Sequence, residues 1–249
     1  MKTPKSFDQI GTIAIFNEFP RKNRQKLVKS ILNQRIRTVA LKTKAYSGKL
    51  RLPKIKIIAG DKTKETVHRE NGILLKTHVE KCYFSMRSSS ERLRIAKLVV
   101  DNESVLVMFS GIAPFPLVIE KNANPKEIYA VELNKKCHKY ALENLKLNKS
   151  RKIQLFKGNV KKVLPKLKKS FDRIIMPHPS DSFSYLSLAL KYINPNGMIH
   201  FYVFGQEKDI PKLKKRIMSY SEKIKIKNVV KAGYYAPYTY RLCFDLQTS

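Results

Sequence analysis

Acidic residues, cysteines and long apolar runs are scarce in this chain of 249 residues, and each shortage excludes a class of protein. No apolar run reaches the length of a transmembrane helix, and the N-terminal MKTPKSFDQI lacks the apolar stretch of a signal peptide. The cysteines Cys82, Cys137 and Cys243 form no CxxC pair and no zinc-binding spacing. We therefore expect a cytoplasmic protein in a reducing compartment, with no membrane association and no metal. The absence of tryptophan and the low number of glycines exclude nothing further.

The excess of basic residues is the strongest signal in the composition. Lysine and arginine total 51 against 19 acidic residues, a formal net charge of +32. Such an excess repels itself in a compact chain, and a polyanionic partner relieves that repulsion. Because the basic residues are spread along the whole chain, they favour a folded protein that binds nucleic acid over a disordered basic arm. A membrane surface is the runner-up, but no isolated basic amphipathic helix stands out.

The pattern of the first 80 residues differs from that of the rest. Short strand-like runs surround one basic helical segment, which predicts a small α+β domain. It holds 19 basic and 6 acidic residues, a net charge of 19 − 6 = +13. We therefore divide the chain into residues 1–80 and 81–249. The predicted strands are 11–17, 37–42, 53–60 and 71–80, and the helical segment is 21–34.

From residue 103 onward, strand and helix patterns alternate. This alternation predicts a parallel sheet with right-handed crossovers, and two final strands without a helix between them predict an antiparallel hairpin at one edge. The fold class is α/β, with the seven-stranded Rossmann-like architecture of class I methyltransferases. The predicted strands are 103–109, 127–133, 152–158, 171–176, 197–205, 225–235 and 239–247, and the clearest helices are 134–149, 160–167, 183–193 and 209–220.

Ligands of such sheets bind beyond the carboxyl ends of the strands, which directs attention to the loops there. The glycine of MFSGIAPF suits a nucleotide-binding turn, but a tight strand-to-helix turn needs glycine on structural grounds alone. Glu132 stands where an acid can accept hydrogen bonds from both ribose hydroxyls of a nucleoside, or where it is simply an acid at a helix start. Asn159 could bind an adenine edge or merely cap a helix.

One stretch, KCYFSMRSSSERLR at 81–94, places a single carboxylate among arginines. In an ordinary interpretation, a serine at 88–90 caps a helix and Glu91 sits in its first turn, where negative charge suits the helix dipole. The following ERLRIAKLVV is then an amphipathic helix.

These stretches together resemble, over nearly the whole chain, the archaeal and eukaryotic family of tRNA guanine-37 N1-methyltransferases. The resemblance implies S-adenosyl-L-methionine as the cofactor and the anticodon loop of tRNA as the partner. It covers the family's second domain, which binds tRNA, and its catalytic domain, while the extra N-terminal domain of many relatives is not matched. The matching stretches include SGKLRLPKIKIIAG, HRENGILLKTHVEKCYFSMRSSSER, MFSGIAPF, IYAVELN, ENLKLNK, RIIMPHP, GMIHFYVFG and YYAPYTYRLCFDL.

Carried over by position, the resemblance assigns roles to individual residues. Glu91 falls on the proposed general base that removes the guanine N1 proton, and both interpretations of Glu91 can hold together. Arg51 falls on the arginine that supports negative charge developing at guanine O6. The substrate residues are Tyr83, Arg87, Arg92, His178 and Pro179, and the arginines beside Glu91 are expected to contact tRNA. The cofactor-binding residues are Arg87, Phe109, Gly111, Glu132, Leu133, Asn159, Val160 and Pro177.

The chain departs from the family pattern at three places. Val107 replaces the usual acid before the Met-Phe pair, and Asn159 stands where relatives usually have aspartate. Pro177-His178-Pro179 replaces an Asn-Leu-Pro whose asparagine orients the base. Three interpretations are open: His178 takes over the role of the asparagine, the pocket is more open than in relatives, or His178 is only a loop histidine.

The leading hypothesis is a monomeric enzyme that methylates N1 of guanine 37 in tRNA. The altered loop makes a second activity plausible, methylation of C7 of the tricyclic wyosine precursor at the same nucleotide. An aminocarboxypropyl transferase shares the MFxGxxPF region, although the C-terminal strands resemble the methyltransferase more closely. A non-catalytic tRNA-binding protein is the remaining alternative, supported by the missing motif residues.

Overall fold

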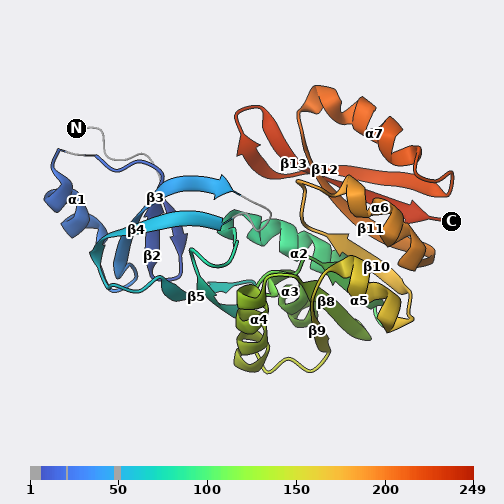
Figure 1. Ribbon diagram of the computed structural model, residues 1–249, viewed down its shortest axis with the longest axis horizontal. Helices are drawn as coiled ribbons and strands as arrows, with labels where there is room; N and C mark the ends of the chain where they lie inside the picture. The colour runs from blue at the N-terminus through green and yellow to red at the C-terminus, as the bar shows by residue number, and fades with distance from the viewer. Residues whose placement is uncertain (1–6, 21, 48–51) are drawn as a thin grey trace.

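The computed structural model describes residues 7–20, 22–47 and 52–249, so Arg51 lies outside the described residues. Figure 1 shows a small N-terminal sheet domain beside a larger α/β domain, with helix α2 (Ser89–Leu98) running between them. Within the described residues, no helix combines the length and the apolar character needed to span a bilayer.

The small domain is built on a four-stranded sheet with strands in chain order. Strands β1 (Asp8–Ile10), β2 (Ile13–Phe16), β3 (Thr38–Ser47) and β4 (Leu52–Gly60) lie side by side, and β2 and β3 are parallel. Helix α1 (Arg24–Ile31) connects β2 to β3, as a parallel crossover requires. Phe16, Ile36 and Val39 form the buried core of this domain.

A separate hairpin, β5 (Glu65–Glu70) and β6 (Ile73–His78), joins the small domain to the larger one. The side chains of Asn144 and Asn148 hydrogen-bond the backbone of β6 from the larger domain, at 2.7–3.0 Å. The sequence pattern predicts β6 but misses β5, because four of the six residues in ETVHRE are ionisable. A chain boundary after residue 80 stays a prediction, since this hairpin packs against the second domain.

The seven-stranded sheet has the order β12-β13-β11-β10-β7-β8-β9. The five strands from β7 to β11 are mutually parallel, and β13 runs antiparallel to both β11 and β12. The predicted fold class and the antiparallel edge hairpin are therefore confirmed. The strands are β7 (Ser104–Met108), β8 (Glu127–Glu132), β9 (Ile153–Lys157), β10 (Phe171–Met176), β11 (Ile193–Gly205), β12 (Ile224–Ala236) and β13 (Thr239–Thr248).

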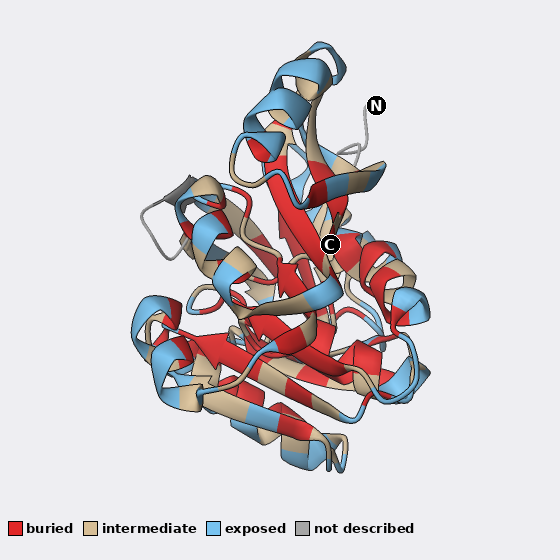
Figure 2. Cartoon of the chain, turned by 90° about the vertical axis from the view of Figure 1, so that its right-hand side faces the viewer, coloured by how far each residue is buried: buried red, intermediate tan, exposed pale blue. Residues whose placement is uncertain are grey.

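Helices cover both faces of this sheet, and strand β7 shows why. Val105 and Val107 belong to the cluster that includes α2, α3 and α4, whereas Leu106 and Met108 belong to the cluster that includes α5, α6 and α7. A strand alternates its side chains between faces, so a continuously apolar strand needs a cover on each. Figure 2 shows the resulting buried centre and exposed outer faces. The helices are α3 (Pro114–Asn122), α4 (Lys135–Leu147), α5 (Val160–Leu167), α6 (Phe183–Tyr192) and α7 (Ile210–Met218).

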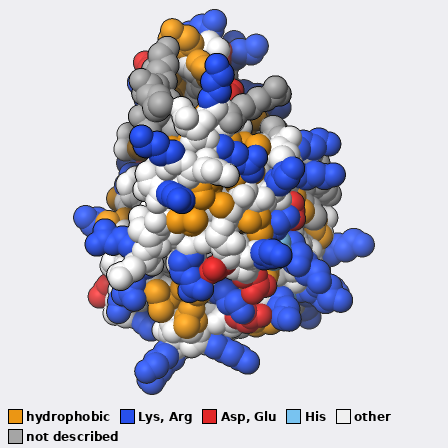
Figure 3. Space-filling model, turned by 90° about the vertical axis from the view of Figure 1, so that its left-hand side faces the viewer, with side chains coloured by type: hydrophobic (Ala, Val, Ile, Leu, Met, Phe, Trp, Pro, Cys, Tyr) orange, Lys and Arg blue, Asp and Glu red, His pale blue; other side chains and the backbone are white. Residues whose placement is uncertain are grey.

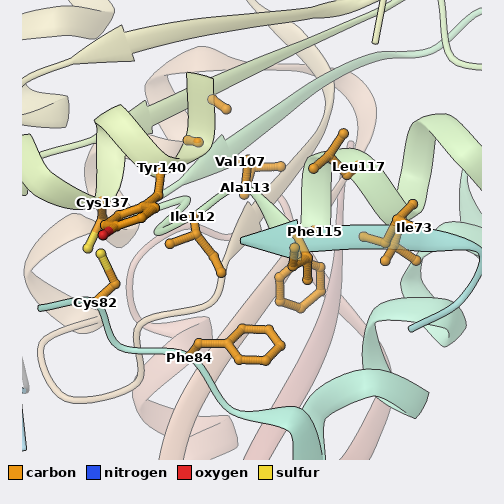
Figure 4. Packing of buried hydrophobic residues seen from close by; sticks show 14 of the residues in the cluster. Ile73, Cys82, Phe84, Val107, Ile112, Ala113, Phe115, Leu117, Cys137 and Tyr140 are labelled. Atoms are coloured by element: carbon orange, nitrogen blue, oxygen red, sulfur yellow. The ribbon is translucent and has the colours of Figure 1, made fainter. Parts of the chain in front are cut away.

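The first of these clusters reaches from the hairpin to the sheet. Figure 4 shows Ile73 of β6, Phe84 of the following segment, Phe115 of α3 and Val107 of β7 in one packed group, with Cys82 and Cys137 directed toward one another. All three cysteines are buried free thiols. This continuous packing fixes the segment 81–92 against the carboxyl ends of the parallel strands.

Candidate functional site

A cavity of about 410 Å³ opens at the carboxyl ends of β7, β8, β9 and β10. It lies at the switch point of the sheet, because the chain runs outward through β7, β8 and β9 and then returns to β10 on the other side of β7. The segment between β6 and α2 closes it from the small-domain side. Of the predicted site residues, the wall contains Tyr83, Arg92, Phe109, Gly111, Glu132, Leu133, Asn159, Val160, Pro177 and His178.

Glu132 ends β8 with its carboxylate in the cavity wall. Its Oε2 accepts a hydrogen bond from the Gly111 backbone N–H at 2.7 Å, and its Oε1 accepts one from the Asn134 N–H at 2.6 Å. The side chain is buried, and burial raises the pKa of Glu132 against these backbone hydrogen bonds. The Leu133 N–H adds a third backbone hydrogen bond, and the lone-pair capacity of the carboxylate that remains is open to a ligand hydroxyl.

The loop after β7 turns sharply so that its backbone faces the cavity. Phe109 has φ +59° although it is not glycine, and Gly111 also has φ +59°. A Cβ on Gly111 would meet nothing closer than 3.8 Å, so glycine is required here by the backbone conformation rather than by space. The Phe109 ring packs 4.8 Å from the Tyr185 ring and 5.6 Å from the His178 ring, between centroids.

Two asparagines cap the helices that start at this edge. Asn134 accepts from the N–H groups of Lys136 and Cys137 at the start of α4, and Asn159 accepts from Lys161 N–H at 2.9 Å at the start of α5. The capping interpretation of Asn159 is therefore confirmed, while Asn159 also lines the cavity. Both helix N-termini point their free backbone N–H groups toward this edge.

The loop after β10 divides its three residues between two environments. Pro177 and His178 line the cavity, opposite the β8 and β9 loops. Pro179 is buried outside the wall, and its carbonyl accepts from the Ser182 hydroxyl at the start of α6 at 3.4 Å. The expected substrate contact of Pro179 does not fit this placement, because its side chain is buried, whereas Ser180 and Asp181 after it line the cavity again.

Glu91 is buried one layer behind the cavity wall, although Ser88 and Arg92 on either side of it line the cavity. Its two carboxylate oxygens accept from Arg94 Nε and Nη2, both at 2.8 Å. Oε1 also accepts from the Tyr202 hydroxyl at 2.5 Å. Burial, with the nearby Cys243 thiol and the Glu91 carboxylate, raises the pKa of Tyr202 well above its ordinary value, so the phenol remains a donor.

Arg94 connects Glu91 to a buried polar chain that the sequence patterns do not indicate. Burial opposes its charge, but its hydrogen bonds to Glu91 and Asp245 raise the pKa of Arg94. Arg94 Nη1 donates to Asp245 Oδ2 at 2.8 Å, and His200 Nδ1 lies 2.7 Å from Asp245 Oδ1. His200 Nε2 lies 2.7 Å from Arg173, whose guanidinium also binds Glu103.

This chain also explains a cluster that has the composition of a metal site. His200, Cys243 and Asp245 place potential ligand atoms within 4.8 Å of one another. Arg94 donates to Asp245 and Arg173 contacts His200, so two guanidinium cations already occupy the ligand atoms. A bound cation would have to displace both, and the cluster is therefore an internal ion-pair network.

The arginines near Glu91 have protein partners in this structure. The sequence predicts tRNA contacts for Arg92 and Arg94, but Arg92 is 3% exposed and binds Glu70 in a bidentate pair at 2.5 Å. Arg92 is thus a wall residue held by β5 rather than a surface cation. Arg87 is exposed, lies outside the cavity and binds Asp8 of β1 at 2.7 Å, so the expected cofactor contact is not formed.

Arg241 on β13 is a cavity residue that the sequence analysis missed. Its Nη1 donates to the Ser88 hydroxyl at 2.8 Å and its Nη2 to the Ala232 carbonyl at 2.6 Å. Nε of Arg241 is buried without a hydrogen-bond partner, and the guanidinium carbon lies 5.5 Å from the centre of the Tyr202 ring. The only sequence signal was a basic residue within YYAPYTYRLCFDL, which no local pattern separates from the many others.

Comparison with known proteins places this geometry in a family. Residues 66–230 match the TRM5/TYW2 methyltransferase domain. The chain belongs to the TRM5/TYW2 methyltransferase family. It is 34% identical to the tRNA (guanine(37)-N(1))-methyltransferase Trm5b of Pyrococcus abyssi, over 99% of this chain and 76% of that protein. The predicted family and methyltransferase fold are thereby confirmed.

Other TRM5/TYW2 relatives carry different activities at similar identity. The tRNA (guanine(37)-N(1))/4-demethylwyosine(37)-methyltransferase Taw22 of Nanoarchaeum equitans is 32% identical, over 88% of this chain and 91% of that protein. A tRNA(Phe) (4-demethylwyosine(37)-C(7)) aminocarboxypropyltransferase of Methanocaldococcus jannaschii is 31% identical, over 96% of each. The family thus modifies tRNA at position 37, and identity alone does not separate the reactions.

Solved structures agree with this assignment. The crystal structure of Trm5b from Pyrococcus abyssi matches with a TM-score of 0.86 at 33% identity, covering 99% of this chain and 76% of that one. TYW2 of M. jannaschii in complex with S-adenosylmethionine matches with a TM-score of 0.75 at 26% identity, covering 97% and 98%. The expected cofactor is confirmed for the family by this complex.

Proposed function

We propose that this protein transfers a methyl group from S-adenosyl-L-methionine to N1 of guanine 37 in tRNA. The observation that carries the proposal is the cavity at the switch point, where the buried Glu132 carboxylate faces a positive-φ loop and two capped helix starts. Support also comes from the Pyrococcus abyssi relative and its 99% coverage of this chain.

The residues of the cavity fit this cofactor. Glu132 is the acceptor for the ribose hydroxyls, and Leu133, exposed at 41%, offers an apolar edge to the base. Gly111 and Phe109 bring backbone close to the ligand, and Asn159 and Val160 close the β9 side. The bound cofactor supplies an electrophilic methyl group on sulfur. Val107 stands where relatives usually have an acid. It lies inside β7 and is fully buried, so this difference takes no polar group away from the cavity wall.

The substrate side of the site is formed by the 83–92 segment and β13. We assign the flipped guanine to the space beside Tyr83, Ser88 and Arg241, because a base must leave its stack to reach the cofactor. Glu91 is the proposed acceptor of the N1 proton, and Arg94 and Tyr202 hold its carboxylate in place. Since Glu91 lies behind the wall, proton transfer requires the carboxylate to turn past Ser88 or the base to reach inward.

Two cations are available for the charge that develops at O6. Arg51 has this role by resemblance, and Arg241 has its guanidinium in the cavity wall, where Nε itself is buried. A guanidinium placed beside a developing oxyanion in a water-poor site stabilises the transition state. Arg241 is therefore the cation that the described geometry favours.

One assay tests the proposal. The protein is incubated with labelled S-adenosyl-L-methionine and unmodified tRNA, and the modified nucleoside at position 37 is identified. We expect 1-methylguanosine at that position alone. Incorporation elsewhere, or an aminocarboxypropyl product, would overturn the assignment, and tRNA binding without any transfer would identify a non-catalytic protein.

A second reaction on the wyosine precursor is the alternative that one feature favours. Pro177 and His178 line the cavity where the sequence resemblance indicates an asparagine and a leucine. Proline offers no side-chain donor to a base, and a loop without that contact tolerates a larger tricyclic ring. The relative from Nanoarchaeum equitans, 32% identical, is named for both reactions.

We propose that the protein acts as a monomer in the cytoplasm.

A further inference from the structure

The closed end of the β12–β13 hairpin carries three tyrosines that face solvent. Tyr234 is 75% exposed, Tyr235 58% and Tyr238 82%. Tyr238 and Tyr234 are the two most exposed large hydrophobic side chains in the part of the chain that the structure describes. Single exposed apolar side chains are ordinary, but a cluster of aromatic rings on one loop marks an interaction site. We call these three residues the tyrosine patch.

The backbone of the patch gives no structural reason for a tyrosine at its tip. Ala236 pairs with Thr239, so Pro237 and Tyr238 are the central residues of the turn. Tyr238 has φ +58°, a position where glycine or asparagine is favoured after a proline. A tyrosine there strains the turn, and its exposed ring gains nothing from burial. The residue is better explained by a contact with another molecule.

Two of the three rings are supported from below. The Tyr235 ring stacks on Phe204 of β11, with centroids 4.0 Å apart and planes 30° apart. The Tyr234 ring lies 4.9 Å from the Tyr240 ring. Rings supported in this way lose little conformational freedom when a partner stacks on their outer faces. Phe204 pairs with Arg241 across the sheet, whereas Tyr240 packs on the opposite face, so Tyr235 is held on the Arg241 face of the hairpin and Tyr234 on the other.

The patch adjoins the rim of the cavity. The Ala232 carbonyl, two residues before Tyr234, accepts from Arg241, and Arg241 in turn donates to Ser88. Arg241 and Ser88 both line the cavity. In Figure 1 the closed end of the hairpin projects from the large domain toward the side of the small domain. A ligand that fills the cavity and extends outward would pass the hairpin face that carries Tyr235 and reach the turn at Tyr238.

The electrostatic surroundings select the chemical class of that ligand. The chain has a net charge of +32, and Figure 3 shows lysine and arginine side chains dispersed over the face formed by the small domain, with few acids. At the patch itself, Lys231 lies 5.0 Å from the Tyr240 ring, and Glu207 pairs with Lys231. The ion pair balances the charge at the patch itself, so the basic character comes from the chain as a whole; exposed rings on a chain of this charge match the unpaired bases and the phosphates of single-stranded RNA.

We propose that the tyrosine patch is a stacking site for unpaired RNA bases next to the modified nucleotide. The inference rests on the proposed function for its substrate and extends it with a subsite on β12–β13. Turning one base into the cavity removes the stacking partner of its neighbours in the loop. The exposed rings replace that partner, so the loop is held open while its target base lies inside.

The test measures binding of an anticodon stem-loop RNA by fluorescence anisotropy, with 2-aminopurine in turn at each loop position beside 37. The double variant Tyr235→Ala/Tyr238→Ala should bind about 5- to 100-fold more weakly, the range for losing one stacked base. The double variant to phenylalanine keeps the rings and should bind like the wild type. Lys227→Ala, farther along the exposed side of β12, is the matched control for an effect of surface charge. Wild-type protein should change the 2-aminopurine emission, and the alanine variant should not.

Three results would overturn the proposal. One is equal binding of the wild type and the alanine variant to the stem-loop. Another is an equal loss on a blunt-ended RNA duplex of two complementary strands, which has no unpaired bases to stack. The third is an alanine variant whose oligomeric state changes while its RNA affinity does not, which would make the patch a contact between copies of the chain.

The test also separates this inference from the proposed function. If RNA binding depends on the rings but no methyl group reaches position 37, the stacking site stands and the proposed reaction falls. If methyl transfer occurs with unchanged binding in the alanine variant, the reaction stands and the stacking site falls.

Discussion

At the scale of single residues, Glu91 combines the strongest functional assignment with a buried position behind the cavity wall. Its carboxylate is held by Arg94 and Tyr202 behind the wall of the cavity. If it accepts the N1 proton, Glu91→Gln should lower kcat by about 100-fold or more, with tRNA affinity little changed. Single-turnover methyl transfer, with tRNA binding measured separately, provides the test.

Glu103→Gln is the matched control for this variant. Glu103 belongs to the same ion-pair chain, where it binds Arg173, but it lies away from the cavity. Both substitutions weaken a buried ion pair, and only Glu91→Gln removes a base. Equal losses of kcat in the two variants would mean that Glu91 acts through the fold alone.

Glu132 offers a test of the cofactor site. Glu132→Ala should weaken binding of S-adenosylhomocysteine by about 10- to 100-fold, the scale of losing hydrogen bonds to a charged group, and leave tRNA affinity intact. Isothermal calorimetry measures both. Glu127→Ala, at the opposite end of β8, is the control. Because alanine leaves the Gly111 and Asn134 N–H groups without a partner, Glu132→Gln should be measured as well; unchanged affinity in both variants would leave Glu132 as a structural acid.

His200 predicts how stability depends on pH. Burial lowers the pKa of His200 below its ordinary value of about 6.5, and Arg173 adds to this. Arginine can only donate, so Nε2 of His200 accepts and Nδ1–H donates to Asp245, which is the neutral form. Below about pH 6.5, His200 is protonated in the unfolded chain but stays neutral in the folded chain. The free energy of unfolding contributed by His200 is therefore complete above that pH and falls on acidification.

The slope is up to about 1.4 kcal/mol per pH unit until the folded-state pKa is reached. Denaturant unfolding at several pH values between about 7 and 5 measures it. His200→Asn should flatten the curve in this window. His138→Asn is the control. Burial also lowers the pKa of His138, but the His138 side chain is partly exposed, whereas His200 is fully buried. Asp245 does not interfere, because its pKa is lowered and its own loss of stability lies at more acidic pH. A curve unchanged by His200→Asn would contradict the neutral buried state.

At the scale of elements, the loop after β10 decides the width of the base site. Pro177 and His178 face the cavity, and Pro179 anchors the loop toward α6. If the altered loop admits the larger tricyclic base, the wild type should methylate both guanosine and the wyosine precursor at position 37. The double variant Pro177→Asn/His178→Leu should then be biased towards guanosine, because an asparagine amide would orient the smaller base. Nucleoside analysis of both tRNA substrates measures this, and a wild type inert on the precursor would limit the protein to guanosine.

At the scale of the whole molecule, the basic surface should dominate tRNA affinity. Each phosphate that is bound releases counterions, so affinity should fall at least 10-fold between about 50 and 200 mM salt. The buried cofactor cavity should respond much less over the same range. Filter binding of tRNA and calorimetry of S-adenosylhomocysteine give the two salt dependences. A tRNA affinity independent of salt would contradict a dominant role of the net charge of +32 in tRNA binding.

The sequence by itself determined the order of the elements and the edge at which ligands bind. Strand β7 is an almost continuous apolar run, and helix α5 spans the predicted 160–167. Patterns of this kind follow from side-chain periodicity within one segment, and Glu132, Gly111 and Asn159 follow from being next to strand ends. The strand β5 was missed because its pairing with β6 and its Glu70–Arg92 ion pair outweigh a poor local pattern.

Only the tertiary structure decided which side chains meet. Glu91 lies more than a hundred residues before Tyr202 and Asp245 in the chain, yet Arg94 and hydrogen bonds join the three in one buried network. Arg241 reaches the cavity wall from β13, the last strand of the chain. Arg87 forms an ion pair with Asp8 and lies outside the cavity. Long-range pairing of charges depends on the spacing of strands and helices in three dimensions, and a chain rich in arginine and lysine offers too many equivalent partners for local sequence to choose among them.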